Sequence, residues 1–348
     1  MAHIQTIREG LILKSLKDES PELQRRFVLF HGEDESHWSS TYLNGAHPTV
    51  TDNDIFVVVD SAHDDRVVSS LVLIPQPWRY ESVDLVAARI ELVKTDREYR
   101  ERGLMRELIE AAHTHSADCG HGIQIIMGIS GFYARFGYTQ TVERGHSVDI
   151  LTPRRQPTND HALSLRPATP GDVDLLIAYD NHVSERYLLT VPRGPREWTW
   201  EIEGRPARKR LVSIIQTGDG LPIGYIVTRP DFSNVYARCL GPDASYLETF
   251  DDTVSEMIRL GHEAADRAEK DPPSRIVVQS PAPEIARLVE LTSRITGPPN
   301  RWDWYIRAND LAALIRKLRP VLECRLKNST AHRYSGDLTL DLAEGDGI

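Results

Sequence analysis

The order of predicted elements, which occurs twice along the chain, constrains the fold more than any other feature. In residues 10–138 a strand and a helix precede three strands, a long helix, a buried strand and a short helix. Residues 163–281 repeat this theme, with a hairpin whose turn is Gly218-Asp219-Gly220, and show no evident residue identity to the first copy. We therefore predict tandem copies of one α+β domain.

Local signals define the elements of the first copy. Ser20 before Pro21, with acidic residues in the first turn, predicts a helix within residues 18–30. Two β-branched runs, 54–60 and 66–75, flank an Asp-rich turn and predict a hairpin. The remaining predicted elements are a strand at 10–15, a strand at 84–95, a helix at 98–116, a strand at 121–130 and a short helix in "GFYARFGY".

Composition bounds the class of protein. The chain has 348 residues, which exceeds the usual size of one domain, and 40% of them are hydrophobic. No run of about 18 apolar residues exists, so we expect no membrane span. Three widely separated cysteines indicate free thiols in a reducing cytoplasm. The net charge of −10 argues against a nucleic-acid partner and suits an amine-bearing one.

The polar, proline-containing stretch "TPRRQPTND" predicts a linker between the two copies. We expect a first domain over residues 1–150, a linker over 151–162, a second domain over 163–308 and a C-terminal segment over 309–348. The second copy lacks an Arg-x-x-Gly loop before its long helix, which predicts that the first copy alone carries an anion site.

An arginine-rich loop opens the long helix of the first copy. "TDREYRERG" leads from a strand into the helix, and Gly103 permits a close approach that a Cβ would block. The unpaired amides of a helix N-terminus can donate hydrogen bonds to phosphate oxygens, and Arg100, Arg102 and Arg106 would add charge-assisted hydrogen bonds. The alternative is a solvated helix start with a chance glycine.

These residues resemble the signature of the GNAT superfamily of N-acetyltransferases, Arg/Gln-x-x-Gly-x-Gly/Ala, although Met105 replaces the final small residue. "YRERGLMREL" followed by "GFYARFGY" is similar to the enhanced-intracellular-survival branch of that superfamily. The resemblance implies a catalytic first GNAT domain, a degenerate second one and a partial sterol-carrier-like segment. Each GNAT domain would hold a mixed, mostly antiparallel sheet flanked by helices. It also implies acetyl-CoA as cosubstrate, an amine acceptor and a possible homo-oligomer.

The resemblance assigns roles to individual positions. The strand before the loop would splay open and pair with the pantetheine arm through Val93, Lys94 and Thr95. The pyrophosphate would lie on the loop. The residues implied in cofactor binding there are Arg100, Glu101, Arg102, Gly103, Leu104, Met105 and Arg106.

Two further residues are candidates for proton transfer. In "GFYARFGY", Phe132 and Phe136 share a helical face while Tyr133 points about 100° away, so that it can reach a site. The resemblance implies that Tyr133 protonates the departing thiolate, and the alternative is an ordinary surface tyrosine. Glu91 is the best carboxylate for a general base, or else it faces solvent or pairs with Arg89.

Other functions have less support in the sequence. His113, His115, Cys119 and His121 do not share one helical face, which argues against a zinc site. The main alternative is an inactive CoA-binding or scaffold protein with the same fold. A lipid carrier and an aminoacyl transferase using tRNA are weaker alternatives, because the C-terminal segment is short and the chain is acidic.

Overall fold

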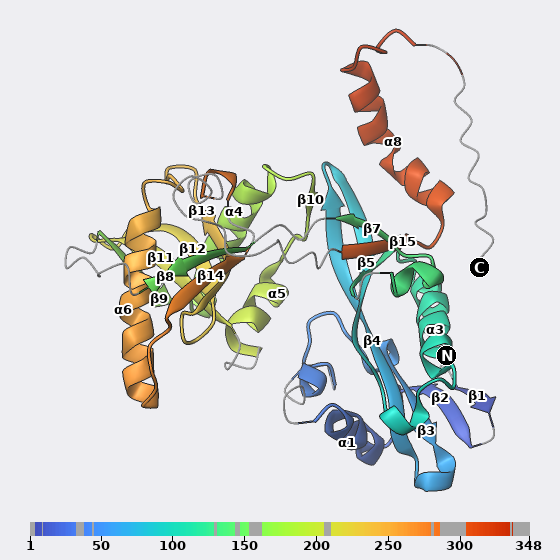
Figure 1. Cartoon of the computed structure of the whole chain (residues 1–348). Coiled ribbons are helices and arrows are strands. Elements are labelled where there is room, and N and C mark those ends of the chain that lie inside the picture. Colours follow the sequence, from blue (N-terminus) through green and yellow to red (C-terminus); the bar gives the residue numbers. More distant parts are fainter. Residues whose placement is uncertain are drawn as a thin grey trace. The chain divides into compact units, whose positions relative to one another are not determined.

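The computed structural model describes residues 4–8, 10–32, 38–43, 45–128, 131–142, 147–152, 162–204, 210–279, 282–285, 304–334 and 336. The chain forms two compact units (Figure 1). The first unit comprises residues 1–142, 188–191 and 302–348, and the second comprises residues 143–187 and 192–301. Each unit holds a mixed sheet with helices, so the predicted α+β class is confirmed.

The sheet of the first unit has the strand order β1-β2-β3-β4-β5-β6-β15-β7, and β10 pairs with β4 outside this path. Among the described pairings of this sheet, β5 and β6 alone run parallel. The bounds of the strands are β1 Ile4–Arg8, β2 Leu11–Ser15, β3 Ile55–Asp60, β4 Arg66–Tyr80, β5 Val83–Thr95, β6 Ile123–Met127, β7 Thr139–Val142, β10 Leu189–Thr190 and β15 Trp304–Ala308.

Helices cover both faces of this sheet because its central strands are apolar on both sides. On β3, Phe56 and Val58 pack in the cluster that contains α3 (Leu104–Asp118), while Ile55, Val57 and Val59 pack in the cluster that contains α1 (Pro21–Phe30). This alternation follows the two-residue period of a strand. The other helical segments of this unit are η1 Asp52–Asp54, η2 Ser61–His63, η3 Arg97–Tyr99, η4 Tyr133–Phe136 and α8 Leu311–Lys327.

The helix signals operate as the residue types predict. The Ser20 side chain accepts a hydrogen bond from the amide of Leu23, and Pro21 occupies the first turn of α1. The long helix α3, in contrast, begins at Leu104 and not at residue 98, because Gly103 at φ 80° ends the preceding turn and caps the helix. The arginine-rich stretch is therefore a loop.

The second unit contains a six-stranded sheet of order β8-β14-β13-β12-β11-β9, in which β13 and β14 run parallel. Its strands are β8 Ser147–Leu151, β9 Leu163–Pro167, β11 Leu211–Thr217, β12 Pro222–Thr228, β13 Asn234–Leu240 and β14 Arg275–Gln279. Its helices are η6 Pro170–Asp172, α4 Val173–Ser184, α5 Pro195–Thr199, η7 Trp200–Gly204 and α6 Phe250–Ala268.

Two strands lie in a different unit from the one that their sequence position suggests. β8 pairs with β14 of the second unit, although it precedes the expected boundary at residue 150. β15 inserts between β6 and β7 of the first unit, although it precedes the expected boundary at residue 308. A strand's sequence pattern specifies which of its faces is buried and does not specify its neighbours, so these pairings are tertiary. The linker predicted at 151–162 lies mostly outside the described residues.

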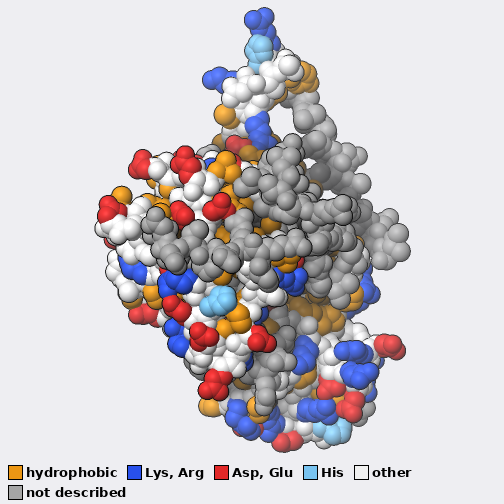
Figure 2. All heavy atoms as spheres, turned by 60° about the vertical axis from the view of Figure 1, so that its left-hand side comes forward, with side chains coloured by type: hydrophobic (Ala, Val, Ile, Leu, Met, Phe, Trp, Pro, Cys, Tyr) orange, Lys and Arg blue, Asp and Glu red, His pale blue; other side chains and the backbone are white. Residues whose placement is uncertain are grey.

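Two surface properties follow from the side chains. Among the described helices, none is long and apolar enough to cross a membrane. Basic and acidic side chains are interspersed on the face drawn in Figure 2. That mixture matches the hydrogen-bonded ion pairs found across the surface, such as Arg25 with Glu22 and Arg79 with Asp84.

A half-buried histidine makes the stability of the first unit depend on pH. His113 hydrogen-bonds through Nε2 to the Tyr138 hydroxyl at 3.1 Å, and that hydroxyl donates to Gln124. Burial, together with nearby Arg307, lowers the pKa of His113 from 6.5 to about 4. Between these values the unfolded chain binds the extra proton, so the free energy of unfolding falls as pH falls.

Between pH 6.5 and pH 4, we expect the free energy of unfolding of His113→Gln to fall by about 1 to 2 kcal/mol less than that of wild type. The measurement is urea unfolding at a series of pH values. His332→Gln, at an exposed histidine of the same unit, is the control. Identical pH dependence in wild type and His113→Gln would contradict the assignment.

Candidate functional site

Strand β5 separates from β6 halfway along its length. The parallel ladder joins Ala87–Ile90 to Ile123–Ile126, and β5 then continues to Thr95 beside β4 alone. At the point of separation the β4–β5 register shifts, because Ser70 pairs with Lys94 while Val72 pairs with Glu91. Leu92 lies within this bulge at φ 50°, a backbone conformation that costs a non-glycine residue about 1 to 2 kcal/mol.

Two fully buried serines on β4 hold the bulge. The Ser70 hydroxyl donates to the Leu92 carbonyl at 3.3 Å and lies 3.0 Å from Nε2 of the buried His31. The Ser69 hydroxyl donates to the Lys94 carbonyl at 3.0 Å. The two hydroxyls therefore bond to backbone carbonyls of β5 at the register shift and just beyond it.

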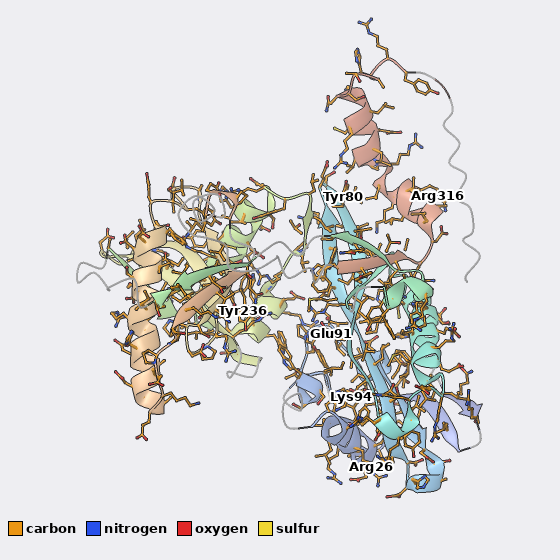
Figure 3. The ribbon with its side chains drawn as sticks, in the orientation of Figure 1. Arg26, Tyr80, Glu91, Lys94, Tyr236 and Arg316 are labelled. Atoms are coloured by element: carbon orange, nitrogen blue, oxygen red, sulfur yellow. The ribbon has the colours of Figure 1, made fainter. Side chains whose placement is uncertain are left out.

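The bulge leaves one edge of β5 open. The Asp96 amide donates to the Val68 carbonyl, and the Lys94 carbonyl also faces β4. Because strand residues alternate, Val93 and Thr95 direct their amide and carbonyl groups to the opposite edge, where the β5–β6 ladder has already ended. Of the three residues predicted for the pantetheine arm, Val93 and Thr95 therefore face this edge. Lys94 directs its carbonyl to β4, and its side chain donates to the Phe30 carbonyl (Figure 3).

The loop after β5 presents free amides at the start of α3. Glu101 at φ 62° and Gly103 at φ 80° both adopt left-handed conformations, which turn successive N–H groups in one direction. Within the described part of the chain, no acceptor meets the amides of residues 101 to 105. The Arg106 amide, in contrast, donates to the Gly103 carbonyl at 2.9 Å within the first turn of the helix.

The arginines of the loop differ in their surroundings. The Arg102 guanidinium lies 4.6 Å from the Tyr99 ring centroid and donates to the Glu98 carbonyl. Arg106 lies over Phe136 at 5.7 Å, and Arg100 is exposed. Tyr99 itself is buried, and its hydroxyl donates to Asp60 at 2.7 Å, which fastens the loop to the β3 end.

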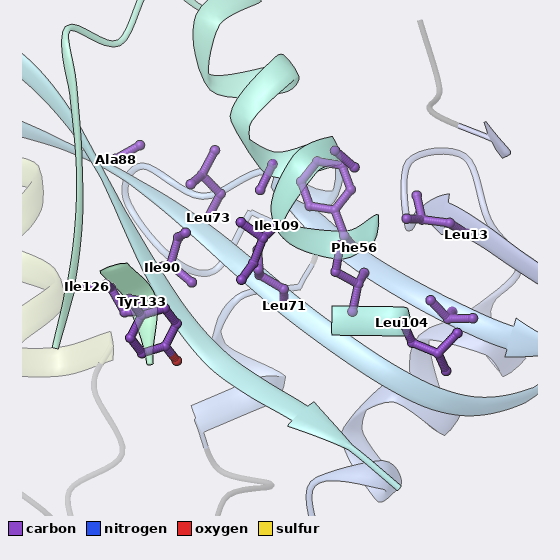
Figure 4. Packing of buried hydrophobic residues seen from close by; sticks show 14 of the residues in the cluster. Leu13, Phe56, Leu71, Leu73, Ala88, Ile90, Leu104, Ile109, Ile126 and Tyr133 are labelled. Atoms are coloured by element: carbon purple, nitrogen blue, oxygen red, sulfur yellow. The ribbon is translucent and has the colours of Figure 1, made fainter. Parts of the chain in front are cut away.

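Tyr133 is a core residue and not a surface one. Its side chain is 7% exposed and packs beside Ile90 and Ile126 (Figure 4). Phe132 and Phe136, which we expected to anchor this turn, are only partly buried. The turn is a 3₁₀ helix of four residues, so the face expected from α-helical spacing does not apply.

The room for the Tyr133 ring comes from Gly128. A Cβ at that position would lie 2.1 Å from the ring, and no described residue hydrogen-bonds to the Tyr133 hydroxyl. Burial and the negative charge of Glu91 raise the pKa of Tyr133 above 10. The phenol is therefore protonated at neutral pH.

Glu91 lies at the bulge, on β5 (Figure 3). Its carboxylate is half-exposed and sits 3.2 Å from Nε of Arg89, without hydrogen-bond geometry. Of the alternatives that we considered, the pair with Arg89 is therefore present. The charge of Glu91 nevertheless acts on Tyr133, so both candidates for proton transfer lie near the opening between β5 and β6.

Sequence reasoning missed the residues that support this site. Ser69 and Ser70 stand in the middle of an apolar strand, which is a signal that could have marked the bulge. Gly128 follows a buried strand and precedes the turn with Tyr133, which again marks a close approach. Tyr99 and Asp60 are far apart in sequence, and no local pattern joins them.

The histidines near the end of α3 have other partners. His115 lies 2.8 Å from buried Asp54, and His121 lies 3.2 Å from Ser116. Across the residues that the structure describes, no three potential ligands gather around one point. Cys119, Cys239 and Cys324 are free thiols.

Comparisons with known proteins agree with this architecture. Residues 24–141 match the family model described as acetyltransferase (GNAT) domain. No curated protein matches the chain in sequence. The whole chain is similar in fold to several solved structures.

The first is a GCN5-related N-acetyltransferase from Kribbella flavida, with a TM-score of 0.59 and 18% sequence identity. The match covers 88% of this chain and 73% of the Kribbella chain. N-myristoyltransferase of Saccharomyces cerevisiae with bound myristoyl-CoA has a TM-score of 0.59 at 11% identity, over 88% and 84% of the two chains. A probable N-acyltransferase from Enterococcus faecalis V583 has a TM-score of 0.59 at 14% identity, over 91% and 75%. At these identities the likeness concerns the fold.

Gly128→Ala tests whether the glycine makes the site. The added methyl group meets the Tyr133 ring, so we expect a loss of about 1 to 3 kcal/mol in the free energy of unfolding, or a displaced ring. Gly122→Ala is the matched control, because its Cβ would meet only the Val86 carbonyl at 3.9 Å. Urea unfolding and Tyr133 ring chemical shifts report both effects, and equal behaviour of the two variants would count against the close approach.

Proposed function

We propose that this chain, whose residues 24–141 form a GNAT acetyltransferase domain, moves an acetyl group from acetyl-CoA to an amine by direct transfer. The observation that carries the proposal is the open edge of β5, which continues without interruption into a loop of free amides. An extended ligand with amides at one end and phosphates at the other fits this sequence of groups.

The edge of β5 suits the pantetheine arm. Val93 and Thr95 offer the hydrogen bonds of a strand that, among the described pairings, has no neighbour on that side. An amide-bearing chain completes them in the manner of an added strand. The strained conformation at Leu92, held by Ser69 and Ser70, is consistent with a backbone shaped for a ligand.

The loop suits the pyrophosphate. The amides of residues 101 to 105 lack partners among the described residues, and the positive end of the α3 dipole favours an anion there. Exposed Arg100 and the stacked Arg102 add positive charge. Leu104 has its side chain in the core, and Met105 is half-buried, so we propose that both contribute their amides.

Glu91 and Tyr133 are proposed for the proton transfers. Acetyl-CoA supplies the acyl group as a thioester, from which the C–S bond breaks as the C–N bond to the amine forms. Glu91 accepts the proton that the amine loses, and Tyr133 donates its phenolic proton to the leaving sulfur. Exchange with solvent after the products leave returns Glu91 to its carboxylate form and Tyr133 to its phenol form.

The second candidate is a protein that binds CoA without turnover. The half-exposed carboxylate of Glu91, already beside Arg89, favours this alternative. Thioester hydrolysis or transfer in the presence of polyamines, lysine peptides and amine-rich antibiotics distinguishes the two. Membership of the enhanced-intracellular-survival branch, a sterol-carrier-like segment beyond residue 309 and a homo-oligomer remain proposals beside this one.

The loop prediction is tested by acetyl-CoA binding in calorimetry. We expect the double variant Arg100→Ala and Arg102→Ala to bind about 10- to 100-fold more weakly, because charge-assisted hydrogen bonds to phosphate are lost. Arg25→Ala, which removes an exposed arginine paired with Glu22 on α1, is the control. Unchanged affinity in the double variant would remove the cofactor from this loop.

Tyr133→Phe is expected to lower kcat by about 10²- to 10⁴-fold while the affinity for acetyl-CoA stays within about twofold. The reason is that the variant keeps the buried ring and removes only the proton donor. Steady-state kinetics and calorimetry measure the two quantities. Tyr138→Phe, which removes a buried hydroxyl on the same side of the sheet, is the control. A parallel loss of affinity would assign Tyr133 to packing.

A further inference from the structure

The second unit repeats the open strand of the first. β13 pairs with β14 only through Asn234 and Val235 and then continues to Leu240 beside β12. The β12–β13 register also shifts at this point, between Val227 and Thr228. The architecture of β5 with its bulge is therefore present twice.

One hydrogen bond aligns the two strands residue by residue. In the first unit the Asp96 amide donates to the Val68 carbonyl, and in the second the Gly241 amide donates to the Ile223 carbonyl. Leu240 therefore corresponds to Thr95, and Arg238 corresponds to Val93. Arg238 and Leu240 direct their backbone groups away from β12, at the edge that β14 has left.

In the second unit this edge already has an occupant. The Tyr246 hydroxyl accepts from the Leu240 amide at 3.2 Å and donates to the Arg238 carbonyl at 3.3 Å. The Tyr246 hydroxyl thus acts as both acceptor and donor, and it satisfies the Leu240 amide and the Arg238 carbonyl together. An amide of a pantetheine arm would make the same pair of bonds at Thr95 and Val93.

Charge at the start of the following helix also differs between the units. Arg238 donates to the Tyr246 carbonyl at 3.2 Å and to the hydroxyls of Thr249 and Thr253 in the first turns of α6. The amides of Thr249 and Phe250 at this helix start donate to the Ser245 and Leu247 carbonyls, whereas the amides at the start of α3 have no acceptor among the described residues. The start of α6 therefore lacks the free amides that a pyrophosphate would need.

Tyr246 lines two cavities of the second unit. One, of about 290 Å³, is lined by Leu240, Gly241, Arg186 and Glu284. The other, of about 40 Å³, lies between α6 and the sheet and is lined by Arg238, Val254 and Ile276. Removal of the Tyr246 side chain joins the larger cavity to the open edge.

We propose that Tyr246 is a built-in occupant of a latent pantetheine-type site in the second unit. Its hydroxyl takes the two hydrogen bonds that an amide-bearing ligand would take, and its ring fills the path from the larger cavity to the strand. The comparison with β5 rests on the proposed function of the first unit. The site itself is defined by groups of the second unit alone.

The test uses pantetheine as the probe. Pantetheine lacks the pyrophosphate group of CoA, for which the second unit offers no free helix-start amides. The full-length Tyr246→Ala variant is saturated with CoA, which fills the first unit if the proposed function is correct, and pantetheine is then added. Calorimetry and the amide NMR signal of Leu240 report binding. Tyr236→Ala is the matched control, because Tyr236 is another half-buried tyrosine and lies on β13 itself (Figure 3).

We expect pantetheine to shift the Leu240 amide signal in Tyr246→Ala. Its affinity for this variant should be at least about tenfold higher than its affinity for wild type or for Tyr236→Ala. A folded Tyr246→Ala without such a shift overturns the proposal, as does binding at Leu240 in wild type. Failure of CoA to bind wild type would sink the function proposed for the first unit and leave this readout intact.

Tyr246→Phe keeps the ring and removes only the hydroxyl. This variant tests the proposal if Tyr246→Ala does not fold. It should bind no pantetheine, and the Leu240 amide should exchange with solvent at least about tenfold faster than in wild type, because its acceptor is gone. Unchanged exchange would show that the hydroxyl does not hold this edge and would overturn the proposal.

Discussion

The register shift at Leu92 is the constraint on which the candidate site depends. A strand that stayed paired with β6 along its whole length would have no free backbone groups, and the loop after it would approach α3 from another direction. The bulge costs conformational energy at Leu92, and the hydroxyls of Ser69 and Ser70 offset that cost by bonding to the displaced carbonyls. The open edge accompanies this departure, and the left-handed Glu101 and Gly103 then present the amides at the start of α3.

The two units show what the same strand geometry does with different side chains. In the first unit the edge of β5 ends in free amides beside Arg100 and Arg102, which favours an anionic ligand. In the second unit the Tyr246 hydroxyl satisfies the equivalent edge groups, and the amides of Thr249 and Phe250 at the start of α6 donate to nearby carbonyls. The fold supplies the opening in both cases, and a few side chains decide whether it is available.

Local sequence patterns were sufficient where the physics is local. The Ser20-Pro21 helix start, the two-residue alternation of β3 and the glycine before α3 each act within a few residues, and each appears in the structure. The same reasoning failed at Tyr133, because a 3₁₀ turn changes the angle between successive side chains and because the ring follows the space beside Gly128. It also failed for β8 and β15, whose partners come from distant parts of the chain.

The sequence by itself determined the α+β class and the position of the arginine-rich loop, because periodicity, caps and glycines act on neighbouring residues. The tertiary structure alone decided which strands pair, that Tyr133 is buried near the charge of Glu91, and that Tyr99 fastens the loop to Asp60. It also decided that Tyr246 closes the second edge. These features depend on contacts between residues far apart in the chain, and no pattern of near neighbours encodes such a distance.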